Sequence, residues 1–188
     1  MKILAFAASL RKGSLNRKLI GVVTDILREL GGEVDLAEFH EFDMPLFDGD
    51  RQAAEGLPPG ALALERRMRA APAMVIATPE YNYSIAGPLK NAIDWVSRTK
   101  DQPFDNKPVA VQSCSQGPLG GARMQYHWRM AMTYLKAHIF GTPEVFVGVA
   151  QNKFDKETLE LQDQPTKDAV KAQLASFAKF IARVKASA

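Results

Sequence analysis

The chain has few of the features that would place it outside a reducing compartment. It holds one cysteine, Cys114, in 188 residues, so it cannot form an internal disulfide, which fits a reducing cytoplasm. No apolar run approaches the roughly 20 residues that a membrane-spanning helix needs. The chain enters a strand almost at once, at residues 2–8, so we expect no signal peptide. The sequence therefore predicts a cytoplasmic protein without a membrane partner.

Motifs for metals, nucleoside triphosphates and nucleic acids are also missing. The histidines, His40, His127 and His138, do not show the spacing of metal ligands, and no cluster of cysteines or carboxylates joins them. Residues 9–17 match neither the Walker A loop nor the G-x-G-x-x-G fingerprint. The net charge is only +3 and the basic residues are scattered, which argues against a nucleic-acid role. A mild positive charge suits a small anionic ligand.

What the chain does contain is an alternation of strands and amphipathic helices, without a linker between domains. The length suits one domain, residues 1–188. We expect strands at 2–8, 33–37, 73–78, 107–112 and 143–149. We expect helices at 15–30, 61–70, 86–98, 121–137 and along the C-terminal stripe of Val170, Leu174, Phe177, Ile181 and Val184. A long loop rich in proline and glycine is expected across 44–60.

This alternation predicts an α/β fold. Strands that alternate with helices form a parallel sheet that is covered by helices on both faces. Right-handed crossovers then leave few topologies. We favour a flavodoxin-like doubly wound sheet of order 2-1-3-4-5, because the pattern supplies only five strands.

The loop after the first strand has the residues of a phosphate site. Ser9 and Ser14 offer hydroxyls, Arg11 offers a planar fork of donors, Asn16 offers an amide, and Gly13 permits a tight turn. Ser14 is also a candidate N-cap, so the free N–H groups of the following helix point at the same place. The alternative is a plain capped loop with solvated charges.

The loop after the third strand suits a flat polar ring. It reads Thr78-Pro79-Glu80-Tyr81-Asn82-Tyr83-Ser84 and combines a carboxylate, an amide and two aromatic rings. Alternatively, Tyr81 and Tyr83 simply pack on the sheet edge. In a 2-1-3 order the first and third strands are neighbours, so both loops open on one crevice at the carboxyl ends of the strands. A phosphate cradle beside an aromatic loop predicts a mononucleotide with a planar ring.

A third loop, residues 113–121, follows the fourth strand into the same crevice. Its glycines let the backbone approach a ligand closely, and Ser115 is a candidate donor to the ring. Cys114 could be read as a nucleophile, but no histidine lies in a matching local context. We favour a small, partly buried residue at the end of a strand.

Three segments resemble the NAD(P)H-dependent FMN reductases, a family with quinone and chromate reductase members. They are S-L-R-K-G-S-L-N at 9–16, T-P-E-Y-N-Y-S-I-A-G-P-L-K-N-A-I-D-W-V-S-R at 78–98 and G-G-A-R-M-Q-Y-H-W-R at 120–129. The resemblance implies a flavodoxin-like fold and non-covalent FMN. By this resemblance the phosphate is held by Ser9, Arg11, Ser14 and Asn16. The flavin and ribityl are lined by Glu80, Tyr81, Asn82 and Tyr83, and Ser115 approaches the ring.

The resemblance also implies an enzyme that accepts hydride from NADPH or NADH and reduces quinones or similar acceptors, including metal oxyanions such as chromate. We expect a ping-pong cycle and no catalytic side chain, because FMN carries the chemistry. Family members are dimers or tetramers, and Arg123, Tyr126 and Glu144 resemble their subunit contacts. The alternatives are a flavodoxin-type electron carrier, usually strongly acidic around its flavin, and a flavin-binding redox regulator.

Overall fold

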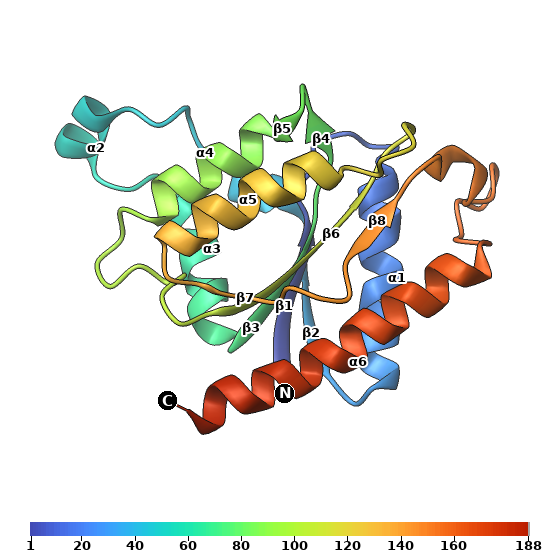
Figure 1. Ribbon diagram of the computed structural model, residues 1–188. Helices are drawn as coiled ribbons and strands as arrows, with labels where there is room; N and C mark the ends of the chain where they lie inside the picture. The colour runs from blue at the N-terminus through green and yellow to red at the C-terminus, as the bar shows by residue number, and fades with distance from the viewer. Residues whose placement is uncertain (188) are drawn as a thin grey trace.

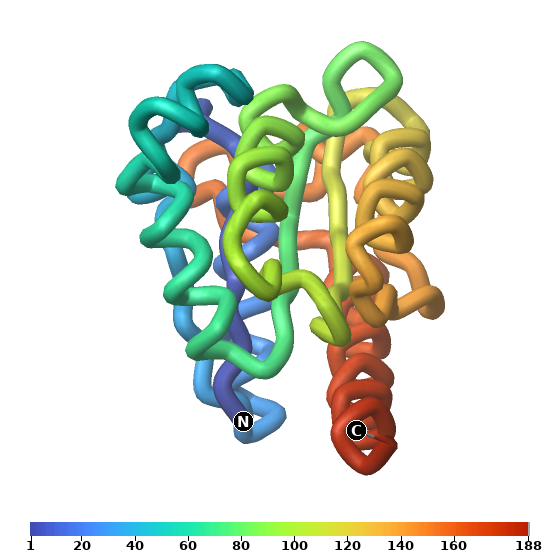
Figure 2. The backbone as a smooth tube through the Cα atoms, turned by 90° about the vertical axis from the view of Figure 1, so that its left-hand side faces the viewer, coloured from blue at the N-terminus to red at the C-terminus, as the bar shows by residue number. Residues whose placement is uncertain are grey.

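A parallel sheet forms the middle layer of the computed structural model, which describes residues 1–187 (Figures 1 and 2). The strand order is β2-β1-β3-β6-β7, and β8 also pairs with β6. Every pairing in this sheet is parallel. The flavodoxin-like order 2-1-3-4-5 is therefore confirmed. The strands are β1 (Lys2–Ala7), β2 (Glu33–Ala37), β3 (Ala73–Ala77), β6 (Pro108–Cys114), β7 (His138–Ile139) and β8 (Val145–Val147).

Helices cover both faces of the sheet, as the sequence predicts (Figure 1). One core lies between the sheet and α1 with α6, and the other lies between the sheet and α3, α4 and α5. The apolar stripe of α6 is buried at Val170, Leu174, Phe177 and Ile181, while Val184 is half-buried. The helices are α1 (Leu15–Glu29), α3 (Pro59–Ala70), α4 (Gly87–Val96), α5 (Ala122–Tyr134) and α6 (Gln164–Ala186).

The fifth position of the sheet differs from the prediction of one strand at 143–149. Two short strands share it: β7 pairs with the start of β6, and β8 pairs with its end. Gly141 and Pro143 lie between them. Proline has no N–H to donate, so the ladder cannot run through this segment. The break leaves the carboxyl end of β6 paired with β8, close to the third loop.

The predicted loop 44–60 is wrong over residues 49–55, where the chain forms the short helix α2 (Gly49–Glu55). The Asp48 carboxylate caps it by accepting hydrogen bonds from the N–H groups of Asp50 (2.8 Å) and Arg51 (3.3 Å). No residue of α2 is buried. A helix without an apolar stripe gives no periodic signal, which is why the sequence pattern missed it.

The pattern also missed three other short elements. Two are the 3-10 helices η1 (Phe39–Phe42) and η2 (Ala150–Asn152), and the third is a hairpin of β4 (Glu80–Tyr81) and β5 (Ser84–Ile85). Over residues 1–187, no helix is long and apolar enough to cross a membrane. The same residues contain no group of three or more histidine, cysteine or carboxylate side chains that could hold a metal ion.

Candidate functional site

The three predicted loops meet in one pocket of about 120 Å³ at the carboxyl ends of β1, β3 and β6. We call it the cradle pocket. All of the predicted site residues line it except Asn82 and Tyr83, which lie at the turn of the β4–β5 hairpin. Its lining is Ser9, Arg11, Ser14, Leu15, Asn16, Pro79, Glu80, Tyr81, Cys114, Ser115 and Gln116.

The first loop presents donors to the cradle pocket at the start of α1. Ser9 and Ser14 are buried, whereas Arg11 is exposed and donates only a 3.2 Å hydrogen bond to the Gly13 carbonyl. Ser14 occupies the N-cap position, as predicted, but its hydroxyl makes no capping hydrogen bond. The first turn of α1 holds no acidic residue. Its N–H groups and positive dipole end are therefore open to an external anion.

Asn16 ties the first loop to the third. Its Nδ2 donates to the Cys114 carbonyl and its Oδ1 accepts from the Cys114 N–H, both at 3.0 Å. Asn16 is buried, so this two-way pairing satisfies backbone groups at the end of β6 that have no access to water. The sequence predicts that this amide binds a phosphate. In the structure the amide hydrogen-bonds the Cys114 backbone instead, and this pairing holds the first and third loops together.

The β4–β5 hairpin packs against α5, and its first strand lines the cradle pocket. Asn82 and Tyr83 form its turn with φ of 48° and 72°, the left-handed region that both central residues of a type I′ turn require. Tyr83 is strained there, since bulky residues rarely adopt positive φ. The Arg123 guanidinium lies 4.0 Å from the centre of the Tyr83 ring, a cation–π contact that offsets part of the strain.

Glu80 connects this hairpin to the start of α5. Its carboxylate accepts a 3.2 Å hydrogen bond from the Met124 N–H and lies 3.6 Å from Arg123 Nη1. Lower on the hairpin, the Ser84 hydroxyl hydrogen-bonds His127 Nδ1 at 2.9 Å. His127 is not among the site residues predicted from the sequence. Its position four residues after Arg123 places both side chains on one helix face, a spacing that could have indicated it.

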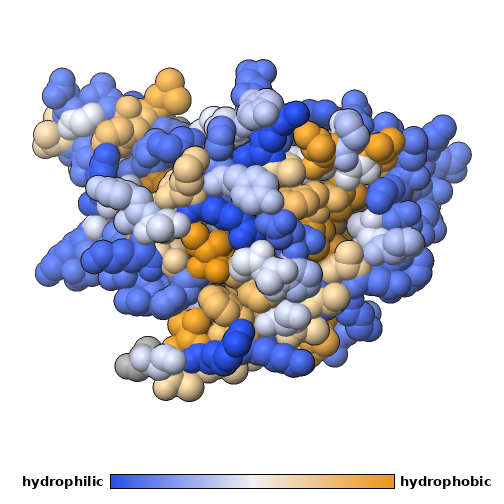
Figure 3. Space-filling model, viewed as in Figure 1, coloured by the Kyte–Doolittle hydropathy of each residue, from blue (hydrophilic) through white to orange (hydrophobic). Residues whose placement is uncertain are grey.

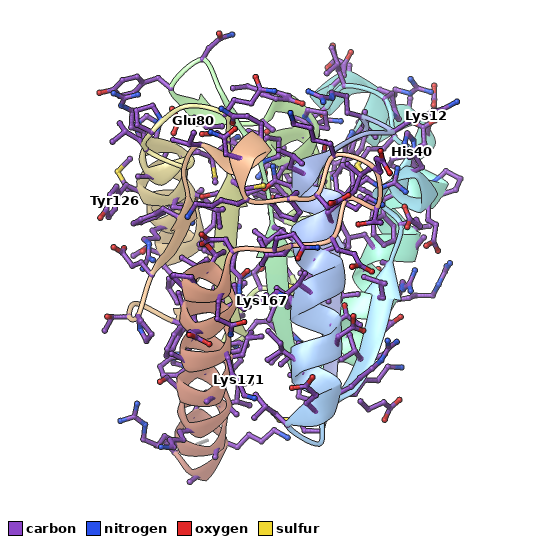
Figure 4. The ribbon with its side chains drawn as sticks, turned by 90° about the vertical axis from the view of Figure 1, so that its right-hand side faces the viewer. Lys12, His40, Glu80, Tyr126, Lys167 and Lys171 are labelled. Carbon is purple, nitrogen blue, oxygen red and sulfur yellow. The ribbon has the colours of Figure 1, made fainter. Side chains whose placement is uncertain are left out.

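Arg123 does not join Tyr126 and Glu144 within one chain. The Tyr126 hydroxyl donates to Glu144 at 3.3 Å, but the arginine that pairs with Glu144 is Arg129, at 3.2 Å. Figure 4 shows Tyr126 and Glu80 on the same side of the molecule. The α5 helix therefore carries two separate ion pairs, one at the hairpin and one at Glu144.

The backbone conformation of the third loop requires glycine at two positions. Gly120 and Gly121 have φ of 59° and 89°, and an added Cβ at Gly120 would lie 2.6 Å from the Val147 nitrogen. Ser115, the predicted ring donor, is half-buried and donates a 3.3 Å hydrogen bond to the Gly117 carbonyl. Burial raises the pKa of the Cys114 thiol to about 12, so it carries no thiolate at neutral pH. Its position at the end of a strand is confirmed, but the side chain is fully buried and not partly buried as predicted.

These loops and this fold match a known family over most of the chain. The sequence profile described as NADPH-dependent FMN reductase matches residues 1–152. The chain belongs to this family. A quinone reductase of Escherichia coli strain K12 is 44% identical over 188 residues, which cover 98% of this chain and 97% of the relative. An NAD(P)H-dependent FMN reductase of Pseudomonas aeruginosa is 39% identical over 189 residues, with the same coverage of each chain, 98% and 97%.

Among solved structures, the FMN reductase fold is matched by FerB, a flavoenzyme NAD(P)H:(acceptor) oxidoreductase from Paracoccus denitrificans. The TM-score is 0.83, with 27% sequence identity and 97% of each chain covered. The family resemblance of the three sequence segments is therefore confirmed by both sequence and fold. It agrees with the position of the cradle pocket at the point where strand order reverses.

This FMN reductase has a second, larger cavity that the sequence did not reveal. We call it the recess, and its volume is about 520 Å³. Its roof is the segment 43–47, which is held on α4 because the Pro45 carbonyl accepts hydrogen bonds from Asn91 Nδ2 (2.9 Å) and Trp95 Nε1 (2.7 Å). Mostly apolar side chains line it, with His40, Asp43 and Asn91 among Leu10, Phe39, Phe42, Met44, Leu46, Gly87 and Pro88.

Proposed function

We propose that the cradle pocket binds FMN by its phosphate and that the enzyme passes hydride from NADPH or NADH to quinones. The observation that carries the proposal is the donor set at the start of α1. Ser9, Ser14 and Arg11 converge with first-turn N–H groups that no side chain caps. Together with the absence of an acidic residue in that turn, this arrangement suits a phosphate dianion. The residues present therefore fit the group that the family name implies.

Each loop has a separate task in this proposal. Ser9, Arg11 and Ser14 hold the phosphate, and Asn16 keeps the first and third loops at a fixed distance through Cys114. Glu80, Tyr81 and Ser115 line the path from the phosphate to the ring, and Asn82 and Tyr83 orient the ring from the hairpin turn. FMN, when bound, supplies the redox chemistry. No side chain is assigned as a catalytic acid, base or nucleophile.

The small volume of the cradle pocket favours one order of substrate binding and product release. A volume of about 120 Å³ lies below the roughly 300–1,000 Å³ of pockets that enclose whole ligands. It therefore holds the phosphate end, and the ring lies at the open rim. Nicotinamide and acceptor must then reach one exposed ring, so they compete for one space. Such competition favours a ping-pong cycle, with quinones first among the acceptors and metal oxyanions such as chromate as further candidates.

The proposal predicts that the protein purifies with FMN and oxidises NADPH or NADH steadily when a quinone is present. Heat-released flavin, identified by chromatography, should be FMN. Initial rates at several fixed quinone concentrations should give parallel double-reciprocal lines. Release of FAD, the absence of any flavin affinity, or intersecting lines would each contradict a part of this proposal. An electron carrier or a redox regulator would show no steady turnover with a quinone.

We also propose that the single domain 1–188 forms a cytoplasmic homo-oligomer through α5. This helix leaves Tyr126, Met130 and Tyr134 exposed, the last two by 65% and 85%. Figure 3 shows apolar side chains reaching the surface around α5 and β8. Exposed apolar residues that gather on one face mark interaction surfaces. Arg123 and the pair of Tyr126 and Glu144 border the same face, as the family resemblance implies for a subunit contact.

Light scattering should therefore report a dimer or a tetramer at micromolar concentration. Met130→Glu should shift the protein toward the monomer, because it places a charge within the apolar face of α5. Leu62→Glu, at an exposed position on α3, is the matched control and should leave the assembly unchanged. A monomeric wild-type protein would rule out this interface.

A further inference from the structure

A third cavity lies on the other side of the start of α1 and is lined by cations. We call it the basic pocket, and its volume is about 200 Å³. Lys12 comes from the first loop, and Arg17 and Lys18 come from the first turn of α1. They face the carboxyl end of β2 at Leu36 and Ala37. The position is again at the carboxyl edge of the sheet, but beside β2 and not at the point where strand order reverses.

The charge of the basic pocket is only partly balanced. Arg17 forms an ion pair with Glu38, which is the acidic residue of this lining. Lys12 and Lys18 have no ion-pair partner within residues 1–187. Arg17 and Lys18 also lie at the positive end of the α1 dipole, which disfavours cations. Two positive charges are thus held in a place where an anion would be stabilised.

The FMN phosphate does not account for these lysines. The cradle pocket is lined by Arg11 but by none of Lys12, Arg17 and Lys18, and the basic pocket is lined by those three but not by Arg11. The two linings have no residue in common. The start of α1 therefore separates the two pockets, and a phosphate in the cradle pocket would leave the lysines of the basic pocket without a counter-ion.

The recess adjoins the basic pocket and begins next to the loop that forms the cradle pocket. Phe39 lines both the recess and the basic pocket, and Leu10, between Ser9 and Arg11, lines the recess. His40 Nε2 lies 3.1 Å from the Leu10 carbonyl and donates to it, since a carbonyl can only accept. This bond ties η1 to the first loop. Figure 4 shows Lys12 and His40 at the same end of the molecule.

We propose that the basic pocket binds the 2′-phosphate on the adenosine ribose of NADPH. This inference rests on the proposed function, because it takes a nicotinamide nucleotide as the electron donor. A ligand with its nicotinamide near the flavin would cross the apolar recess and place its far phosphate between Lys12 and Lys18. A phosphate monoester carries about −1.5 to −2 charges at neutral pH, which matches the two lysines without partners. NADH lacks this phosphate, so NADPH is the preferred donor.

The test compares Lys12→Gln/Lys18→Gln with Lys167→Gln/Lys171→Gln. Both double variants remove two positive charges, and each pair has one exposed and one half-buried lysine. Lys167 and Lys171 lie on α6, away from Lys12 (Figure 4). Calorimetry on FMN-saturated protein measures binding of 2′,5′-ADP and of ordinary 5′-ADP. Steady-state kinetics measure KM for NADPH and for NADH.

We expect the wild-type protein to bind 2′,5′-ADP roughly tenfold or more tightly than 5′-ADP, because charge-assisted contacts to phosphate are strong. The Lys12/Lys18 variant should lose that difference, and its ratio of KM for NADPH to KM for NADH should rise by about tenfold. The Lys167/Lys171 variant should match the wild type. Its result excludes a general effect of net charge on an anionic substrate.

Other outcomes would overturn the assignment. If the wild type binds 2′,5′-ADP and 5′-ADP equally well, the basic pocket either recognises a pyrophosphate or binds no nucleotide. An equal rise of both KM values in the Lys12/Lys18 variant would have the same meaning. These results differ from a failure of the proposed function, which would show as missing FMN or missing NAD(P)H oxidation in the wild type. The nucleotide titration does not depend on turnover.

Discussion

Replacing Arg11 by alanine should weaken FMN binding by about tenfold to a hundredfold, since a charge-assisted contact to phosphate contributes about 1.5–3 kcal/mol. The exposed Arg11 side chain lines the cradle pocket, and its one hydrogen bond goes to the nearby Gly13 carbonyl. Its remaining donors are free for a ligand. Because the side chain is not part of the core, the fold should survive the change. Fluorescence titration of the flavin-free protein with FMN measures the dissociation constant.

Arg28→Ala is the matched control for this measurement. Arg28 lies in the last turn of the same helix, α1, and is more than half exposed beside Asp25. At about 1.5 Å per residue it is roughly 20 Å from Ser14 along the helix axis. Like Arg11→Ala, the Arg28→Ala substitution removes one positive charge, but from a residue that does not line the cradle pocket. If Arg11→Ala and Arg28→Ala both leave the dissociation constant at the wild-type value, Arg11 is not a phosphate ligand.

The order of the sheet could be predicted from the sequence because its central strands are almost continuously apolar. The ends of β6 show where such prediction stops. The strand was expected at 107–112, ending at the buried Gln112, but it continues through the buried Ser113 to Cys114. Their partners come from distant helices: Gln173 Oε1 accepts from Gln112 at 2.8 Å, and Gln125 Nε2 donates to Ser113 at 2.8 Å. Polar residues inside a strand look like a strand end until such partners are known.

For the candidate site, the sequence likewise predicted which loops meet but not the contacts between them. Strand order alone brings the three loops to one edge, and the structure confirms that they meet. The pairing of Asn16 with Cys114 joins residues 98 apart in sequence, so no local pattern contains it. The recess depends likewise on Pro45, whose carbonyl binds Asn91 and Trp95 of α4. Local chemistry identified which residues could bind a ligand, and long-range contacts decide which of them are free to do so.

Replacing Gly120 by alanine should lower the free energy of unfolding by roughly 2–4 kcal/mol, from left-handed backbone strain and steric overlap together. Gly120 has a φ of 59°, and an added Cβ would lie 2.6 Å from the Val147 nitrogen and 2.7 Å from the Gly148 nitrogen. Both atoms belong to backbone at β8, which cannot turn aside as a flexible side chain can. For a chain of this size the loss corresponds to a fall in Tm of about 5–15 °C.

The same substitution should weaken FMN binding, because relief of the overlap requires the third loop to move away from β8. That loop includes Ser115 and Gln116 of the cradle pocket, and Ser115 is anchored to β8 by a 3.1 Å hydrogen bond from its N–H to the Val147 carbonyl.

Gly117→Ala is the control within the same loop. Its nearest neighbour is the Ser115 hydroxyl at 3.8 Å, an ordinary contact distance, so stability should change by less than about 0.5 kcal/mol. Thermal unfolding and FMN titration on both variants separate the two effects. Equal behaviour of the two alanine variants would show that the third loop does not depend on its contact with β8.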